Sequence, residues 1–205
     1  MTHTDDIQTE EGYTPFSLLI LGNGFDKDLG MKTAYRDFAE STFWPFTNLS
    51  NKDQGSLACF LNERKEDVNT WFDLEELLAE FAQNINKTIE QAEKDFQDLD
   101  KVIKSLKEYL QAQEDEFCKK MDTSMHAKRD TPARNVLQRF LKNKEIHSIY
   151  TFNYTNVYRI AMEIMFEAEG KMFSHVHGSI KDNNIILGTG DQREFNPAYF
   201  GFYKS

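Results

Sequence analysis

The chain has 205 residues, of which 40% are hydrophobic, so it is long enough to bury the core of one compact domain. Its 34 acidic and 24 basic side chains give a net charge of -10, and no run of lysine or arginine offers a patch for a phosphate backbone, which argues against direct binding of nucleic acid. Cys59 and Cys118 are the two cysteines, too few for a four-cysteine zinc site or a disulfide framework, and they indicate a reducing compartment.

The first fifteen residues predict a disordered acidic tail, followed by a single domain over 16–205. The tail lacks the basic and apolar regions of a signal peptide, and no apolar run approaches the roughly 18 residues of a membrane span. We therefore expect a cytoplasmic protein with no membrane partner.

The apolar run from Phe16 to Leu21 predicts a strand that is covered on both faces of a parallel sheet. The loop Gly22-Asn23-Gly24 follows it. A helix is expected from about Thr33 to Phe43 with Thr33 as its N-cap, and a short helix from Leu57 to Asn62.

A long helical insertion is predicted between about residues 70 and 130. Its apolar residues recur mostly at alternating spacings of three and four, which indicates one stripe of a long helix, of a bent helical pair or of a coiled coil. The stripe consists of Leu78, Phe81, Ile85, Ile89, Ala92, Phe96, Leu99, Ile103, Leu106 and Leu110. Packing within one chain and packing in a homo-oligomer both remain open.

After the insertion, Asp130-Thr131-Pro132 is typical of a helix start. The following pattern predicts a strand over 146–152, a helix over 157–170 and strands over 172–176 and 185–187. Strand, helix and strand in this order make a parallel crossover unit, so the fold class is α/β, with a Rossmann-like parallel sheet interrupted by the helical insertion.

The glycines of the first loop have two interpretations. Ligands bind such sheets at the carboxyl ends of the strands, and Gly22 and Gly24 let backbone amides approach a phosphate. The dinucleotide fingerprint G-x-G-x-x-G is not met, because Lys27 occupies the position of the third glycine. A tight strand-to-helix turn without a ligand is therefore the competing interpretation.

Polar residues also follow the other two main strands. Asn153 either caps the helix beginning near Asn156 or presents its amide to a ligand. Alternation along the third strand places His175 and His177 on one face, and His177 is the candidate general base because imidazole titrates near neutral pH. No cysteine or clear carboxylate ligand flanks the histidines, so no metal site is expected. We expect all three strand ends to converge at one edge.

Four stretches together resemble the phage abortive-infection AbiH family. They are LILGNGFDKDLGMKTAYRDF from Leu19, WFDLEELL from Trp71, TFNYTN from Thr151 and HVHGS from His175. The resemblance runs from Leu18 to about Gly190 and implies a role in phage defence. Members of that family usually continue further, which leaves open that the sheet is incomplete at its C-terminal end.

A more distant resemblance is to sirtuin-type NAD-binding proteins, in which a glycine turn precedes a T-x-N and an H-G element. It implies NAD as the ligand and Asn153 and His177 as catalytic residues. The nucleotide-binding residues it suggests are Gly22, Asn23, Gly24, Asp26, Gly30, Gly178, Ser179 and Gly188. The chain departs from that pattern, with Asp26 where sirtuins have serine and Thr155 where they commonly have aspartate. It also lacks their zinc module of paired cysteines, which argues against protein deacylation.

The predicted function is therefore abortive infection, with binding of NAD and hydrolysis of its nicotinamide glycosidic bond as the chemistry. Two alternatives remain open. One is a nucleotide sensor without catalysis, and the other is an interaction protein that acts through its helical insertion. Tight dinucleotide binding without breakdown would distinguish the sensor, and no binding at all would distinguish the interaction protein.

Overall fold

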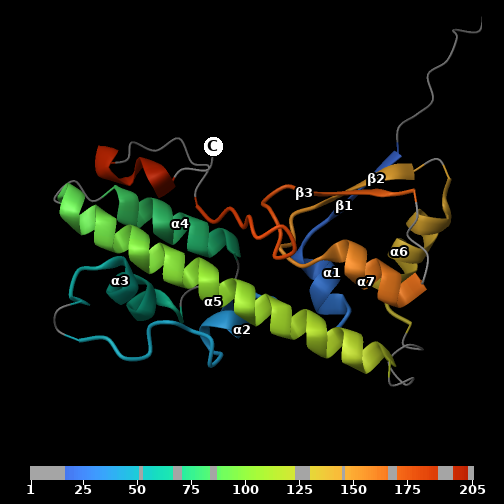
Figure 1. The fold of residues 1–205 in the computed structure, drawn as a ribbon, viewed down its shortest axis with the longest axis horizontal. Coiled ribbons are helices and arrows are strands. Elements are labelled where there is room, and N and C mark those ends of the chain that lie inside the picture. The colour runs from blue at the N-terminus through green and yellow to red at the C-terminus, as the bar shows by residue number, and fades with distance from the viewer. Residues whose placement is uncertain are drawn as a thin grey trace, which may run out of the picture.

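The computed structural model describes residues 17–50, 53–66, 71–83, 87–122, 130–144, 146–165, 170–188 and 196–202. The tail predicted over residues 1–15 lies outside them. A small sheet occupies one end of the molecule, several helices occupy the other, and one long helix runs through both parts (Figure 1).

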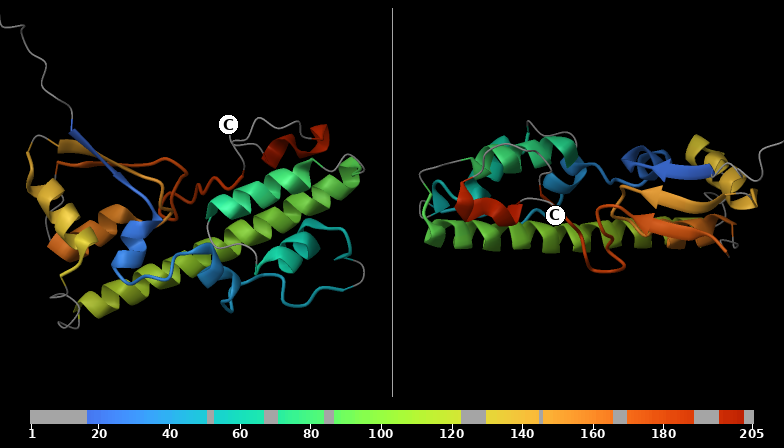
Figure 2. Two further views of the ribbon diagram at one scale, coloured as in Figure 1. Left: turned by 180° about the vertical axis from the view of Figure 1, so that it is seen from behind. Right: turned by 90° about the horizontal axis from the view of Figure 1, so that it is seen from above.

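The sheet consists of three parallel strands in the order β1-β2-β3. These are β1 (Ser17–Leu21), β2 (Ile146–Thr151) and β3 (Met172–His175), which lie close to the strands predicted from the apolar runs. The strand predicted over 185–187 is wrong, because this segment has no regular structure and Ile186 N–H instead donates to the carbonyl of His177. Figure 2 shows the three strands side by side.

Helices cover one face of this sheet, namely α1 (Asn23–Asp28), α6 (Pro132–Lys142) and α7 (Val157–Met165). Leu19, Leu21 and Ile149 point into this covered face and are buried with residues of all three helices. The helix predicted from Thr131-Pro132 is confirmed, with the Thr131 side chain accepting a hydrogen bond from Arg134 N–H.

The opposite face of the sheet is open, so the prediction of a first strand covered on both faces is wrong. Leu18 and Ile20 on this face are 51% and 61% exposed, and Tyr150 and Met172 on the neighbouring strands are exposed as well. A continuous apolar run cannot distinguish a doubly covered strand from one whose alternate side chains meet solvent. A Rossmann-like sheet with helices on both faces is not observed among the described residues.

Four further helices and a 3-10 helix build the other end of the molecule. They are α2 (Tyr35–Ala39), α3 (Leu57–Arg64), α4 (Trp71–Ala82), α5 (Ile89–Asp122) and the 3-10 helix Pro197–Phe202. The helix predicted over 33–43 is shorter than expected and Thr33 is not its cap, because α2 begins after Ala34 and the Thr33 hydroxyl donates to Asn23 instead. The 3-10 helix was not predicted.

The apolar stripe of the helical part packs within the chain. Leu78 of α4 and Leu99, Leu106 and Leu110 of α5 are buried in one cluster with α2, α3 and the 3-10 helix, instead of in a two-helix coiled-coil seam. Ile89 is 72% exposed and does not belong to this cluster. Ile85 lies outside the described residues.

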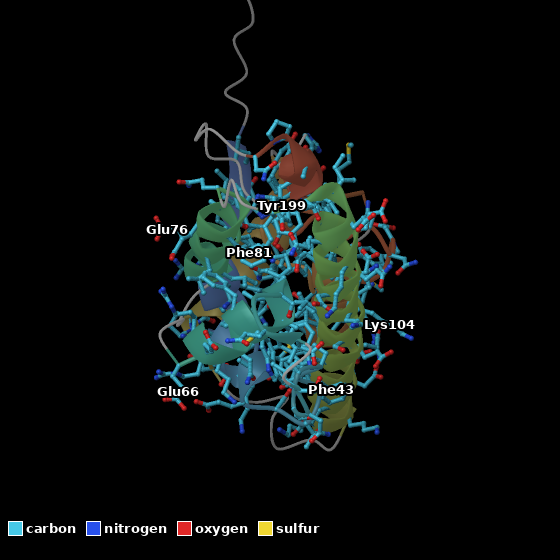
Figure 3. All side chains as sticks on the ribbon, turned by 90° about the vertical axis from the view of Figure 1, so that its left-hand side faces the viewer. Phe43, Glu66, Glu76, Phe81, Lys104 and Tyr199 are labelled. Atoms are coloured by element: carbon cyan, nitrogen blue, oxygen red, sulfur yellow. The ribbon has the colours of Figure 1, made fainter. Side chains whose placement is uncertain are left out.

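Aromatic rings close this cluster against the 3-10 helix. Phe81 and Tyr199 lie toward each other between α4 and α5, with ring centroids 5.6 Å apart (Figure 3). The Tyr199 hydroxyl donates to Asp95 Oδ2 at 2.6 Å, which ties the 3-10 helix to α5. The labelled charged residues Glu76 and Lys104 point outward in the same view.

Helix α5 joins the two parts of the fold. Its 34 residues make it about 51 Å long at 1.5 Å per residue. Leu99 and Leu106 belong to the helical cluster, whereas Phe117 and Met121 belong to the cluster beneath the sheet. The carboxyl ends of the strands lie over the C-terminal half of this helix (Figure 2), so α5 also reaches the edge where the polar residues gather.

Candidate functional site

The carboxyl ends of the three strands meet at one edge of the sheet, as the sequence predicts. Leu21 lies opposite Thr151, and Thr151 lies opposite His175. Beyond these pairs, Phe152 N–H donates to Leu21 O and Val176 N–H donates to Thr151 O, both at 2.9 Å. The segments that follow β1, β2 and β3 therefore leave the sheet side by side.

Three side chains from two of these segments form a buried hydrogen-bonded cluster. Asp26 of α1 is 1% exposed and accepts from Asn153 Nδ2 at 2.9 Å and from the Thr155 hydroxyl at 2.7 Å. Asn153 and Thr155 are also buried. We name these three residues the Asp26 cluster.

Burial sets the protonation of this cluster. Loss of hydration raises the pKa of Asp26 from its usual value of 3.8 to about 7. The hydrogen bonds from Thr155 and Asn153 act in the opposite direction, and the nearby Glu114 carboxylate adds a smaller upward shift. Asp26 therefore changes charge near neutral pH, although it lies away from solvent.

The cluster fixes the orientation of the Asn153 amide. Because Nδ2 donates to Asp26, Oδ1 points the other way, where it is buried and has no hydrogen-bond partner among the described residues. The helix-capping interpretation of Asn153 is wrong, because Asn156 Oδ1 accepts the Arg159 N–H at the start of α7. Asn153 thus presents an unpaired acceptor at the edge of the sheet.

A small cavity lies beside this amide. Its volume is about 20 Å³, enough for one water-sized group, and its lining includes Asn23, Thr33, Tyr154 and the Asp26 cluster. The Thr33 hydroxyl donates to Asn23 Oδ1 at 2.6 Å. The segment that follows α1 therefore fixes the orientation of the Asn23 side chain.

The two glycines of the first loop leave open backbone at the same edge. Gly22 is the N-cap residue of α1 without a side-chain cap, and Gly24 lies in its first turn. Both are exposed, and a Cβ added to either one would meet no atom within 4 Å. The space above them can admit a ligand group or solvent.

Of the other glycines predicted for nucleotide binding, two have a structural role in a turn and the third is buried. Gly30, with φ of 89°, ends α1 by donating from its N–H to Lys27 O. Gly178 has φ of 75°, and a Cβ there would lie 1.9 Å from the backbone oxygen of Asn184. Gly188 is buried at the end of the described segment 170–188.

Ser179 also has internal partners. Its hydroxyl donates to Asp182 Oδ2 at 2.7 Å and accepts the Asp182 N–H at 3.0 Å, and its own N–H donates to Asn184 Oδ1. These bonds hold the turn that follows β3. Binding roles for Ser179, Gly30, Gly178 and Gly188 stay predictions.

The two histidines occupy different environments. Strand β3 ends at His175 and His177 lies in the following turn, so strand alternation does not relate them as predicted. His175 Nδ1 lies 3.0 Å from Asn153 O. The His177 ring instead packs against Phe152 and Tyr154, with centroids 5.3 and 6.4 Å away.

Glu114 of α5 is a buried neighbour that the sequence interpretation missed. It accepts from Asn156 N–H and pairs with Arg159 Nη1 at 3.4 Å, and burial raises the pKa of its carboxyl. Its sequence signal is that Glu114 continues the four-residue spacing of Leu106 and Leu110 on the buried face of α5. The helix thereby connects to the start of α7 beside the Asp26 cluster.

Within the described residues, no group of three or more His, Cys, Asp or Glu side chains is placed to hold a metal ion. The described helices include none with the length and apolar character needed to cross a bilayer.

Comparison with known proteins gives a family for this chain. Neither the search of curated proteins nor that of solved structures gave a significant match. The family model described as Bacteriophage abortive infection AbiH matches residues 18–203, which include β1 from its second residue onward, β2, β3, the Asp26 cluster and α5. The chain therefore belongs to the AbiH family of bacteriophage abortive-infection proteins.

Proposed function

We propose that this AbiH protein serves phage defence by binding NAD at the carboxyl edge of its sheet and hydrolysing the nicotinamide glycosidic bond. The observation that carries the proposal is the unpaired, buried Oδ1 of Asn153, held in place through Asp26. A buried acceptor without a partner costs free energy, and a ligand hydroxyl would supply the missing donor.

The open backbone at Gly22 and Gly24 supports the binding part of the proposal. A pyrophosphate needs close approach to main-chain amides, and side chains beyond glycine would occupy that space. Neither glycine position has a neighbouring atom within 4 Å of an added Cβ. The nicotinamide ribose would then lie toward Asn153, with a hydroxyl donating to Oδ1.

The chemical part of the proposal uses Asn153 and His177. Cleavage breaks the bond between ribose C1′ and the nicotinamide nitrogen, which takes the electron pair, and a water oxygen joins C1′ to give ADP-ribose. Asn153 would hold the ribose as positive charge develops on the sugar. His177 would accept the proton that the water releases.

The small size of the cavity favours a second function, namely a nucleotide sensor without catalysis. A cavity of about 20 Å³ beside Asn153 holds a single hydroxyl or water, and a whole ribose would rest on the edge of the sheet instead of inside it. Such a ligand would remain partly hydrated, which suits binding better than controlled delivery of one water molecule.

Calorimetric titration with NAD and ADP-ribose, together with an assay for released nicotinamide, tests these functions. We expect the wild type to bind and cleave NAD. Asn153→Ala and Gly24→Val should remove binding, whereas His177→Ala should lower the cleavage rate by about 10²- to 10⁴-fold, as is typical of a lost general base. Asn135→Ala, at an exposed position of α6, is the control.

Each other outcome contradicts part of the proposal. Binding without nicotinamide release would support the sensor and overturn hydrolysis. A wild type that binds neither ligand would overturn the nucleotide site and favour an interaction protein acting through its helices. Equal losses from His175→Ala and His177→Ala would remove the specific role given to His177.

A further inference from the structure

A second cavity lies beneath the covered face of the sheet, away from the Asp26 cluster. Its volume is about 330 Å³, within the usual range for small-molecule sites. It is formed by the turn that ends α1, the C-terminal part of α5, the first turn of α6 and one residue of α7. None of the residues predicted for catalysis lines it.

The interior of this cavity is apolar. Met31, Phe117, Met121 and Ile164 line it, and all four are buried. Two of them are methionines, whose unbranched side chains adapt to ligands of different shape. The interior therefore suits an alkyl chain or a ring without polar substituents.

The rim of the cavity is cationic, in contrast to the net charge of the chain. Lys32, Lys120 and Arg134 line it together with one carboxylate, Glu116. Lys120 pairs with Glu116 at 2.6 Å. Within the described segments, neither Lys32 nor Arg134 has a carboxylate at ion-pair distance.

The side-chain oxygens of the neutral polar residues at the rim already accept hydrogen bonds from the protein. Gln113 Oε1 accepts the Lys32 N–H at 3.2 Å, and Thr131 Oγ1 accepts the Arg134 N–H at 3.3 Å. The first turn of α6 is also capped from outside, because Asp28 Oδ2 accepts the Ala133 N–H at 2.7 Å. The Glu116 carboxylate, whose pKa is lowered mainly by its bond to Lys120, also interacts with the Lys32 ammonium. The charged ends of Lys32 and Arg134 are the cationic groups of the rim that can meet a ligand.

We propose that this cavity binds a small amphipathic anion, whose apolar chain enters between Met31 and Met121 and whose carboxylate or phosphate meets Lys32 and Arg134. The apolar part gains free energy by leaving water, and the anionic head stays at the rim where two cations face it. This proposal is independent of NAD chemistry, because it uses a different cavity and different side chains.

Methyl NMR of the full chain labelled with [methyl-¹³C]methionine tests the site directly. Met31 and Met121 report on the cavity, and Met172, which is 66% exposed on the open face of the sheet, reports on unspecific binding. The probes are decanoate, decyl phosphate, 1-decanol and decyltrimethylammonium, each kept below its micelle concentration. Met31→Leu and Met121→Leu assign the signals.

We expect both anions to shift the Met31 and Met121 signals and to leave Met172 unchanged. Their dissociation constants should be about tenfold lower than that of 1-decanol, and decyltrimethylammonium should bind more weakly still. In the double variant Lys32→Gln/Arg134→Gln the advantage of the anions should fall below about threefold while 1-decanol binds as before. Lys142→Gln, an exposed cation on α6 outside the cavity, should change nothing.

Three results would overturn the proposal. The first is no shift at Met31 and Met121 with any probe. The second is equal affinity for the anions and the alkylammonium ion. The third is a shift at Met172 that matches those at Met31 and Met121, which would mean that the probes coat apolar surface in general. The ratio of the dissociation constants of decanoate and decyl phosphate shows which of the two head groups the rim prefers.

Discussion

Asn153 Nδ2 donates a hydrogen bond of 2.9 Å to Asp26 Oδ1, although the two residues are 127 positions apart in the sequence. The bond ties the first turn after β1 to the segment after β2. It also decides which end of the Asn153 amide faces the edge of the sheet. The geometry of the candidate site therefore depends on one buried carboxyl group.

The contribution of Asp26 to the stability of the fold should decrease as the pH rises from about 4 to 7. Its folded pKa of about 7 exceeds its unfolded value of 3.8, so in this range the folded state binds more protons than the unfolded state. Asp26→Asn should remove this contribution, which amounts to at most about 4 kcal/mol. Urea unfolding of both proteins at pH 4 to 8 measures it, and parallel pH profiles would contradict the prediction.

Asn153→Asp should destabilise the protein more at pH 8 than at pH 5. The substitution places a second carboxylate against Asp26, and two adjacent buried carboxylates cannot both ionise without a large cost. Thermal unfolding at the two pH values provides the measurement. Asn135→Asp is the control, because Asn135 is exposed and should show no such pH dependence.

Gly178→Ala should be strongly destabilising, by more than about 2 kcal/mol, whereas Gly24→Ala should be neutral or stabilising. An added Cβ at Gly178 would lie 1.9 Å from the Asn184 backbone at a φ of 75°, but the same atom at Gly24 meets nothing within 4 Å. Denaturant midpoints of the two variants compare them. Equal midpoints would mean that the turn after β3 is not as tightly built as described.

Leu19→Ala should cost about 2 to 5 kcal/mol, and Ile20→Ala less than about 1 kcal/mol. Leu19 is buried under the helices, and Ile20 is largely exposed on the open face. Unfolding free energies from urea titration test the difference. If Ile20→Ala costs as much as Leu19→Ala, a partner or another part of the protein covers the open face in solution.

Leu106→Asp should unfold the protein, and Ile89→Asp should leave it folded. Leu106 is fully buried in the helical cluster, so an unpaired charge there is costly, whereas Ile89 lies on the surface. Circular dichroism and light scattering of both variants report on fold and mass. A wild-type dimer that Ile89→Asp turns into a folded monomer would show that α5 also packs between chains.

The apolar periodicity of the sequence predicted where strands and helices lie better than it predicted which of their faces are buried. The strands near 16–21 and 146–152 and the helix after Thr131 were found because apolar spacing and capping residues are local signals. The exposed positions of Leu18 and Ile20 depend on which helices lie against each face, and no local pattern encodes that. Ile185 and Leu187 are buried without being strands, since they pack on the helical cluster from a loop.

The candidate site was predictable only in part. That the three strand ends meet follows from parallel pairing, and Asn153 and His177 were selected as polar residues at those ends. The contact of Asp26 with Asn153 and Thr155 joins segments from opposite ends of the sequence, which a single sequence does not reveal. The resemblance to sirtuin-type proteins suggested Asp26 as a nucleotide-binding residue, a role that stays a prediction, and the structure buries its carboxyl group against Asn153 and Thr155.

Because β1 pairs with β2, the sheet cannot begin to form until β2 has been synthesised. Leu18 leaves the ribosome early, but its partner residue Ser148 follows only after all of α1 to α6 has been made. At 5 to 20 residues per second, this delay amounts to roughly 6 to 25 s. Helices α2 to α5 all lie within residues 35–122, so they can assemble during that time. During this interval the nascent chain therefore carries an apolar strand whose partner strand has not yet been made.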